Sequence, residues 1–225
     1  MPSPKPIILF DLDGTLVDTA PDLTAALNVS LVAGGAEIVS VDHVRNTIGM
    51  GARKLIERGL ALSDQTADTA ELDNLIEVFL KFYRANIDTH SAFYPGALAL
   101  MDQLDAADIL YAICTNKREA MALSLMEALG HKDRFAMIAG VDTHPVNKPD
   151  PGHLTLTVEH IGADPKRVIM VGDSFADVES ARRAGYPCIG VSFGYTNTPM
   201  RELEPDFVID HLDEIWPHAQ QLLEI

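Results

Sequence analysis

Cysteine and tryptophan are scarce in this chain of 225 residues, which has two cysteines and one tryptophan. Cys114 and Cys188 both lie within apolar runs, so we expect two buried thiols and neither a disulfide nor a cysteine metal site. No apolar run approaches the roughly 18 residues of a membrane helix, and the segment from Met1 to Pro6 lacks the apolar centre of a signal peptide. We therefore expect a cytoplasmic protein with no membrane partner.

Basic residues are also few, with 17 Lys and Arg against 33 Asp and Glu and a formal net charge of −16. Nucleic acids and anionic membranes are recognised by basic patches, so this charge argues against both as partners. A small anionic substrate remains possible, because a metal ion or a few local cations can reverse the field at one site. The length fits one large domain or a domain that carries an insert.

The stretch from Ile7 to Thr15 is a short apolar run that ends in two aspartates, a glycine and a threonine. Its first part has the length and bulk of a strand that is covered on both faces. Gly14 permits a sharp exit of the backbone, which leaves Asp11 and Asp13 at the carboxyl end of the strand. In open α/β sheets this edge is where ligands bind.

About 70 residues with helical apolar spacing follow, and no convincing strand lies among them. The segment begins with a candidate N-cap, Thr19, and an acid three residues later, Asp22. The helices are expected over residues 22–32, 41–48, 52–60 and 70–87.

From Tyr94 onward helical and strand-like segments alternate, which is typical of a parallel sheet with crossover helices. The change from helical apolar spacing to alternating helical and strand-like segments therefore predicts an α/β protein. In it a helical domain, residues 18–90, is inserted into a core of residues 1–17 and 91–225. Strands are expected over 110–115, 135–139, 167–171, 187–191 and 207–209, and helices over 97–106, 118–129, 153–161, 176–184 and 212–223.

Polar side chains that packing does not require follow four of the predicted strands. Because the carboxyl ends of parallel strands meet at one edge of a sheet, these side chains are expected to converge on one pocket. They are Asp11, Asp13, Thr115, Asn116, Lys148, Asp173, Ser174 and Asp177.

These residue types favour phosphoryl transfer. Asp11 is the candidate nucleophile, because a carboxylate can attack phosphorus and form an acyl-phosphate. Asp13 lies on the same side of an extended chain and is suited to protonate the leaving oxygen and later to deprotonate water. Asp11, Asp13 and Asp173 cannot all stay ionised together without a cation, and their hard oxygen ligands suit Mg²⁺.

The other polar residues are expected to support this chemistry. Lys148 would hold the phosphate oxygens, with Thr115 and Asn116 as neutral donors. Asp177, three residues after Ser174, would orient Lys148 or a metal-bound water rather than touch the substrate.

Each of these residues also has a structural explanation. Thr115 or Asn116 fits a helix N-cap, as does the pair Asp173-Ser174, and Lys148 fits a solvated loop. The functional interpretation rests on their joint occurrence at the ends of the predicted strands.

These segments closely resemble the four motifs of the haloacid dehalogenase superfamily. The resemblance implies a Rossmann-like, three-layer α/β/α core with the first strand at its centre and an α-helical cap inserted after the first motif. It also implies Mg²⁺ bound by Asp11, the backbone carbonyl of Asp13, and Asp173. The segments are Asp11-Leu-Asp-Gly-Thr-Leu-Val-Asp18, Cys114-Thr-Asn-Lys117, Asn147-Lys-Pro-Asp-Pro151 and Val171-Gly-Asp-Ser-Phe-Ala-Asp-Val178.

Within the superfamily, further segments look like those of phosphoglycolate phosphatases, which implies hydrolysis of 2-phosphoglycolate. We expect a monomer or homodimer. In such relatives a glycine-flanked cap loop approaches the substrate, so Gly49, Gly51, Arg53 and Lys54 are candidates for binding its carboxylate. Arg53 and Lys54 open a predicted helix and fit a solvent-facing position equally well. Arg118 departs from the relatives, which often have proline there. The matching segments are 18–23, 48–55, 93–96 and 190–195.

Other activities of the same superfamily stay open. A pyrophosphatase or phosphosugar phosphatase would differ mainly in the cap, and a mutase would need a cap that excludes water. A phosphonate hydrolase would need a cap lysine that forms a Schiff base, for which Lys54 is available. A dehalogenase would not need Asp13, and a non-catalytic binding module would be expected to have lost Asp11 or a metal ligand.

Overall fold

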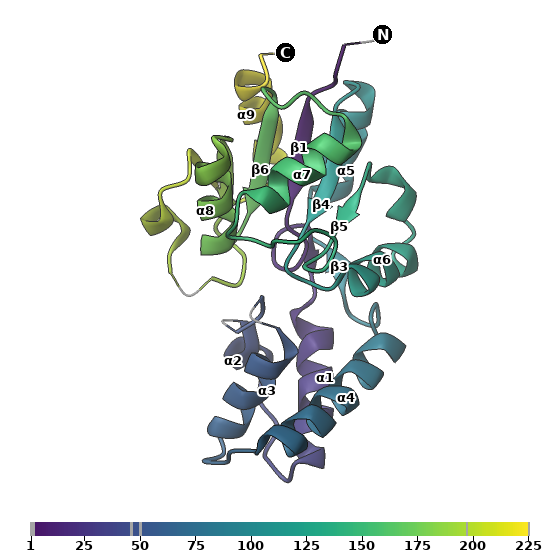
Figure 1. Cartoon of the computed structure of the whole chain (residues 1–225), viewed down its shortest axis with the longest axis vertical. Coiled ribbons are helices and arrows are strands. Elements are labelled where there is room, and N and C mark those ends of the chain that lie inside the picture. Colours follow the sequence, from purple (N-terminus) through teal and green to yellow (C-terminus); the bar gives the residue numbers. More distant parts are fainter. Residues whose placement is uncertain (1–2, 46, 50, 197, 225) are drawn as a thin grey trace. The chain divides into compact units, whose positions relative to one another are not determined.

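A computed structural model describes residues 3–45, 47–49, 51–196 and 198–224 (Figure 1). The chain forms two compact units, one of Met1–Val17 with Phe93–Ile225 and the other of Asp18–Ala92. Met50, which belongs to the expected cap loop, lies outside the described residues. In the part that is described, every helix is too short or too polar to cross a membrane.

The larger unit is built on a six-stranded sheet whose order is β5-β4-β1-β6-β7-β8. All of its neighbouring strands run parallel. The apolar run Ile7–Phe10 forms the central strand β1, and its four side chains are fully buried, as a strand covered on both faces requires. The other strands are β4 (Leu110–Cys114), β5 (Ile138–Ala139), β6 (Val168–Gly172), β7 (Cys188–Val191) and β8 (Phe207–Ile209).

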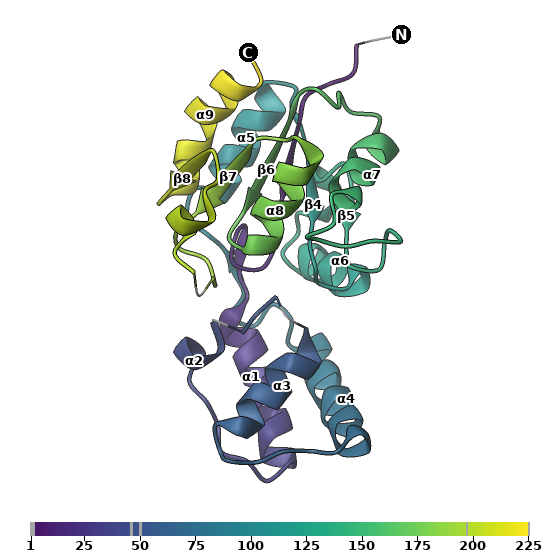
Figure 2. The same cartoon turned by 60° about the vertical axis from the view of Figure 1, so that its left-hand side comes forward.

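Helices cover both faces of this sheet (Figure 2). On one face Ile7 and Leu9 of β1 pack in a cluster with Leu154 of α7 and Val178 of α8. Helices α5 and α9 lie on the opposite face in both views. The helices of this unit are α5 (Ala97–Ala106), α6 (Glu119–Ala128), α7 (Gly152–Ile161), α8 (Phe175–Ala184) and α9 (Ile215–Leu222), with the 3-10 turns Lys132–Arg134, Met200–Leu203 and Leu212–Glu214.

The inserted unit is helical, and α1, α3 and α4 pack on one another. Helix α4 begins with a capping box, in which Asp68 Oδ1 accepts from Glu71 N and Glu71 Oε2 accepts from Asp68 N, both at 2.9 Å. The helices are α1 (Ala20–Ala33), α2 (Val41–Arg45), α3 (Ala52–Ala61) and α4 (Thr69–Ala85).

The expected fold class, a parallel α/β core with a helical insert, is confirmed. The helix expected over 41–48 is wrong in its second half, because α2 ends at Arg45 and Thr47 and Ile48 lie in a turn. This turn leads into Gly49, whose φ of +92° is outside the helical region.

The strand expected over 135–139 shrinks to Ile138–Ala139. Phe135 ends a 3-10 turn, and its ring packs edge-on against Tyr111, 5.3 Å between centroids. Two short strands, β2 (Val17–Asp18) and β3 (Ala92–Phe93), pair with each other and were not expected. Two residues are too few to show the alternation on which strand prediction depends.

Asp22 contacts a segment that lies far along the chain. Thr19 is the N-cap residue of α1, as expected, and the Asp22 carboxylate is buried. It accepts hydrogen bonds from His90 N at 2.9 Å, Ser91 N at 2.8 Å and Ser91 Oγ at 2.7 Å. Asp22 therefore ties the first turn of α1 to the segment that ends the insert.

We expect Asp22→Asn to lower the free energy of unfolding by about 2 kcal/mol, because an amide replaces one acceptor oxygen with a donor that faces other donors. The midpoint of urea unfolding, followed by circular dichroism, measures the change. Asp88→Asn, at an exposed position of the same unit, is the matched control. Equal midpoints for the two variants would show that the hydrogen bonds to Asp22 contribute little to stability.

Candidate active site

The candidate residues meet at the carboxyl ends of the central strands. In the register of the sheet, Phe10 of β1 lies beside Ile113 of β4 and Val171 of β6, so all three strands end at one edge. The backbone N–H of Asp11 donates to the carbonyl of Val171 at 2.9 Å. Gly14 has a φ of +86°, and a Cβ there would lie 2.6 Å from Asp173 Oδ2. The turn after β1 can therefore close over this edge only with glycine at that position.

Lys148 lies buried between two carboxylates. Its Nζ is 2.6 Å from Asp177 Oδ1 and 3.0 Å from Asp11 Oδ1, and its side chain is 1% exposed. Burial alone would lower the pKa of Lys148, but the charges of Asp11 and Asp177 outweigh it and raise the pKa above its ordinary value. The ammonium therefore stays charged, and the alternative of a solvated loop lysine is excluded.

Asp11, Asp173 and Asp177 form a cluster in which one carboxylate oxygen of each lies within 4.8 Å of the others. Burial raises the pKa of Asp11 to about 6, and Asp177 and Asp13 add to this rise while Lys148 opposes it. Burial and the charge of Asp11 also raise the pKa of Asp173. One buried lysine cannot neutralise three carboxylates, so the binding of a cation at this site would be electrostatically favourable.

The hydrogen bonds of the cluster indicate which oxygens could hold that cation. Both Asp177 oxygens are engaged, Oδ1 by Lys148 and Oδ2 by the N–H and hydroxyl of Ser174 at 3.0 and 2.6 Å. Asp11 Oδ1 is buried and accepts no hydrogen bond from the described residues, apart from its ionic contact with Lys148. Asp11 thus offers an oxygen of the kind that hard divalent cations prefer.

Asp173 is held in place from two sides. Its Oδ2 accepts from the backbone N–H of Tyr195 at 2.6 Å, and its Oδ1 accepts from the Thr15 hydroxyl at 3.2 Å. Neutral donors of this kind orient a carboxylate without consuming its charge, so Asp173 keeps the ability to bind a cation.

Asp13 points to a different partner from the other aspartates. Lys117 Nζ lies 2.9 and 3.1 Å from its two carboxylate oxygens, and both side chains are nearly buried. Lys117 belongs to the segment Cys114–Lys117, which resembles a family motif, but the sequence alone did not predict a role for it. The signal that could have found it is a lysine three residues past the end of a buried strand.

Thr115 and Asn116 are not helix caps, because Arg118 is the N-cap residue of α6. The Thr115 hydroxyl accepts from Lys117 N at 3.2 Å, and Asn116 Nδ2 donates to the carbonyl of Lys148 at 3.0 Å. Asn116 therefore supports the loop that carries Lys148. Ser174, in contrast, is the N-cap of α8, so its structural explanation holds.

The expected cap residues all belong to the unit Asp18–Ala92. Gly49 and Gly51 have φ angles of +92° and +85°, so the loop before α3 follows a path that favours glycine. Arg53 forms an ion pair with Asp73, and Lys54 Nζ lies 2.8 Å from Glu57 Oε2. All four of these charged side chains are more than a third exposed, so the two pairs add little to stability.

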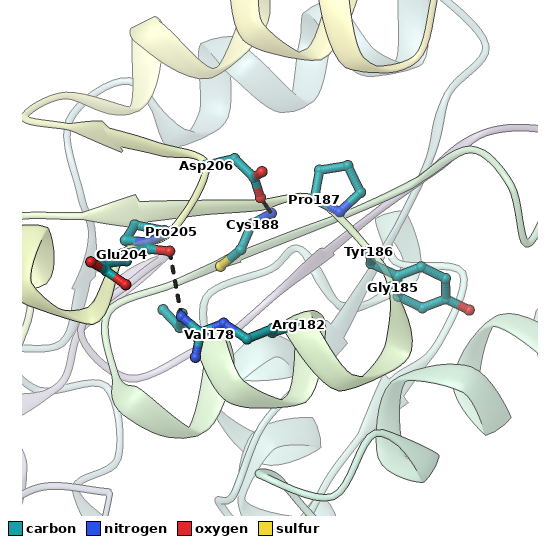
Figure 3. Close-up of a pocket in the computed structure, with 9 residues that line it drawn as sticks. All are labelled: Val178, Arg182, Gly185, Tyr186, Pro187, Cys188, Glu204, Pro205 and Asp206. Atoms are coloured by element: carbon teal, nitrogen blue, oxygen red, sulfur yellow. Dashed lines mark hydrogen bonds between the residues drawn. The ribbon is translucent and has the colours of Figure 1, made fainter.

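A cavity of about 340 Å³ lies apart from these residues, between α8 and the first residue of β7 (Figure 3). Two of its polar side chains already have partners. Arg182 donates to the carbonyl of Leu203 at 2.9 Å, and the Asp206 carboxylate accepts from Cys188 N at 2.8 Å. Cys188 is buried, and its burial raises the pKa of the thiol, so this cavity offers no activated nucleophile.

Comparison with known protein families shows to which family this chain belongs. The family model of haloacid dehalogenase-like hydrolases matches residues 8–191, which include Asp11, Lys148, Asp173 and Asp177. The chain belongs to this family. The expected superfamily is thus confirmed.

Several similar haloacid dehalogenase-like hydrolases carry a specific name. A phosphoglycolate phosphatase of Mesorhizobium japonicum is 48% identical over 94% of this chain and 93% of its own length. A phosphoglycolate phosphatase of Agrobacterium fabrum is 46% identical over 95% of this chain and 91% of its own length. A crystal structure of a predicted phosphoglycolate phosphatase from Haemophilus somnus superimposes with a TM-score of 0.90 at 28% identity, covering 98% of this chain and all of that one.

We expect a divalent cation to stabilise this hydrolase more at about pH 7.5 than at about pH 5. With its pKa raised to about 6 in the folded state, Asp11 without metal contributes stability at low pH that is lost as the pH rises through about 6. A cation reverses that loss, because it binds only the ionised form. The shift in melting temperature between Mg²⁺ and EDTA measures the effect at each pH.

Asp11→Asn is the control for this prediction, because it removes both the titrating group and a ligand atom. Its shift should be small at both pH values. An equally large shift in the unmodified protein at pH 5 and pH 7.5 would contradict the coupling between protons and metal at Asp11.

Proposed function

We propose that this chain is a Mg²⁺-dependent phosphatase that hydrolyses 2-phosphoglycolate to glycolate and phosphate through an aspartyl-phosphate on Asp11. The observation that carries the proposal is the buried Lys148 between Asp11 and Asp177. A fixed cation beside a carboxylate at the end of a central strand is suited to hold a phosphoryl group against its nucleophile. The names of the relatives from Mesorhizobium and Agrobacterium support the substrate.

The first step transfers the phosphoryl group to the protein. A carboxylate oxygen of Asp11 attacks phosphorus, the bond from phosphorus to the glycolate oxygen breaks, and Asp13 gives its proton to that oxygen. Lys148 and the Thr115 hydroxyl hold the phosphoryl oxygens, while Asn116 keeps the loop of Lys148 in place. When Mg²⁺ is bound by Asp11, the Asp13 carbonyl and Asp173, its charge offsets the charge of the phosphoryl oxygens.

The second step releases phosphate. Asp13, now ionised, takes a proton from a water molecule whose oxygen attacks the phosphorus of the aspartyl-phosphate. The bond between phosphorus and the Asp11 oxygen breaks, and both carboxyl groups return to their starting states. Asp177 holds Lys148 by its 2.6 Å contact through both steps, with Ser174 fixing Asp177 in turn.

The carboxylate end of the substrate is assigned to the cap. Gly49 and Gly51 shape the loop before α3, and Arg53 follows at the start of that helix. Arg53 is paired with Asp73 and 44% exposed, so exchanging Asp73 for a substrate carboxylate would cost little. Lys54 is paired with Glu57, so a Schiff base on Lys54 would first require loss of that ion pair.

Phosphatases for pyrophosphate or phosphosugars are the alternative, since they would share the core residues and differ in the cap. A sugar-phosphate mutase or a phosphonate hydrolase is a weaker alternative. The identities of 48% and 46% over nearly the whole chain to proteins named phosphoglycolate phosphatase favour 2-phosphoglycolate.

Asp11→Asn should lower kcat for phosphate-ester hydrolysis by at least about a thousand-fold, because the amide cannot form the acyl-phosphate. Phosphate release measures the loss, and circular dichroism verifies the fold. Asp133→Asn, at an exposed site on a 3-10 turn, should keep full activity. Substantial turnover by Asp11→Asn would rule out the covalent mechanism.

2-Phosphoglycolate should have the highest kcat/KM in a panel that also contains ethyl phosphate, pyrophosphate, phosphosugars and phosphonoacetaldehyde. Arg53→Ala should raise KM for 2-phosphoglycolate by about tenfold, the loss of one charged contact, and leave ethyl phosphate nearly unchanged. Lys81→Ala, at an exposed site in the same unit, is the control. A much higher kcat/KM for another compound in the panel would contradict 2-phosphoglycolate as the substrate. Equal effects of Arg53→Ala on both esters would show that Arg53 does not bind the substrate carboxylate.

A further inference from the structure

The backbone of Lys117 is fixed by the loops around it. Its N–H donates to the Thr115 hydroxyl at 3.2 Å, and its carbonyl accepts from Val141 N at 2.9 Å. The neighbouring Gly140 admits no side chain, since a Cβ there would lie 2.7 Å from the Lys117 carbonyl and 2.2 Å from Glu119 N. The Lys117 side chain therefore starts from a defined point beyond the end of β4.

From that point the Lys117 side chain reaches Asp13, which lies two residues after Asp11. Lys117 Nζ contacts both oxygens of Asp13, at 2.9 and 3.1 Å. The two side chains are 7% and 12% exposed, whereas the Arg53–Asp73 pair is 44% and 59% exposed. An ion pair that is so little hydrated is weakly screened, so Lys117 holds the Asp13 carboxylate in one orientation far more firmly than a surface pair would.

Packing alone does not explain a lysine at this position. Buried ion pairs often add no net stability over apolar residues of similar size. The core phosphoryl site already has its own buried lysine, Lys148, which faces Asp11 and Asp177 rather than Asp13. Lys148 and Lys117 are thus both nearly buried at one edge of the sheet, and they contact different aspartates.

We infer that Lys117 is a positioning residue for Asp13, which it holds in line to transfer a proton to and from the oxygen that leaves or attacks phosphorus. The inference rests on the proposed function. In the first step the Asp13 proton moves to the ester oxygen as its bond to phosphorus breaks and the bond from Asp11 to phosphorus forms. In this assignment Lys117 contacts neither phosphorus nor the oxygens bonded to it and acts only through Asp13, so its removal should matter only where that proton is needed.

The test compares Lys117→Met with the unmodified protein on a series of monoesters: ethyl phosphate, phenyl phosphate and p-nitrophenyl phosphate. The value of kcat/KM reports the steps up to departure of the leaving group. Alkoxide needs a proton to depart and p-nitrophenolate does not. We expect kcat/KM to fall about a hundred-fold for ethyl phosphate, the usual size of a general-acid contribution, and less than about threefold for p-nitrophenyl phosphate.

Four further variants sharpen the test. Asp13→Asn should show the same dependence on the leaving group, and the double variant with Lys117→Met should be no worse than Asp13→Asn alone, because the two residues act as one unit. Lys117→Arg should restore part of the ethyl phosphate activity. Lys166→Met, at an exposed lysine of the same unit, is the control and should behave like the unmodified protein.

The outcomes separate this inference from the proposed function. If the unmodified protein hydrolyses none of the monoesters, the proposed function fails. If it hydrolyses them and Lys117→Met lowers kcat/KM equally for all three, or for none, Lys117 does not act through Asp13 and the inference alone is overturned. If Lys117→Met does not fold, Lys117→Arg and Lys117→Gln carry the same comparison, with a larger loss on ethyl phosphate expected for the glutamine.

Discussion

The site depends on the burial of one ammonium group among carboxylates. Lys148 could not stay charged at 1% side-chain exposure without Asp11 and Asp177 on either side. Burial in turn raises the pKa of both Asp11 and Asp173 above the ordinary value of an aspartate. The charges of this site are therefore coupled, and removing any one of them changes the state of the others.

The sheet supplies the geometry that this coupling requires. Three parallel strands, β4, β1 and β6, end at the same level, and each end carries a side chain or turn of the site. The supporting contacts are local, such as Ser174 on Asp177 and Asn116 on the Lys148 carbonyl. Rigid strand ends with short supporting hydrogen bonds are the arrangement in which charged groups keep their positions during a reaction.

The core of this arrangement could be predicted from the sequence, because its signals are local. The run Ile7–Phe10 is apolar throughout and is buried on both faces, and the aspartates come directly after it. Of the two partners considered for Asp177, Lys148 and a metal-bound water, the contact with Lys148 is present at 2.6 Å. The roles of these residues in catalysis remain predictions, but their convergence at one edge follows from strand order and register.

The parts that were missed depend on contacts between distant segments. Lys117 and Asp13 are 104 residues apart in the chain, and Asp22 and His90 are 68 apart. Neither pairing has a local signature, since a lysine after a strand or an acid in a first helical turn has several possible partners. The early end of α2 and the short β5 likewise reflect a glycine turn and an aromatic contact that helical or strand periodicity does not contain.

The central claim is that Asp11 carries the phosphoryl group, and its most direct test is to find that group. Protein mixed with 2-phosphoglycolate and Mg²⁺ is quenched in acid within milliseconds, digested, and analysed by mass spectrometry after borohydride reduction, which converts an aspartyl-phosphate to homoserine. The account predicts homoserine at position 11 in place of aspartate. A modification at any other residue, or none while phosphate is being released, would contradict it.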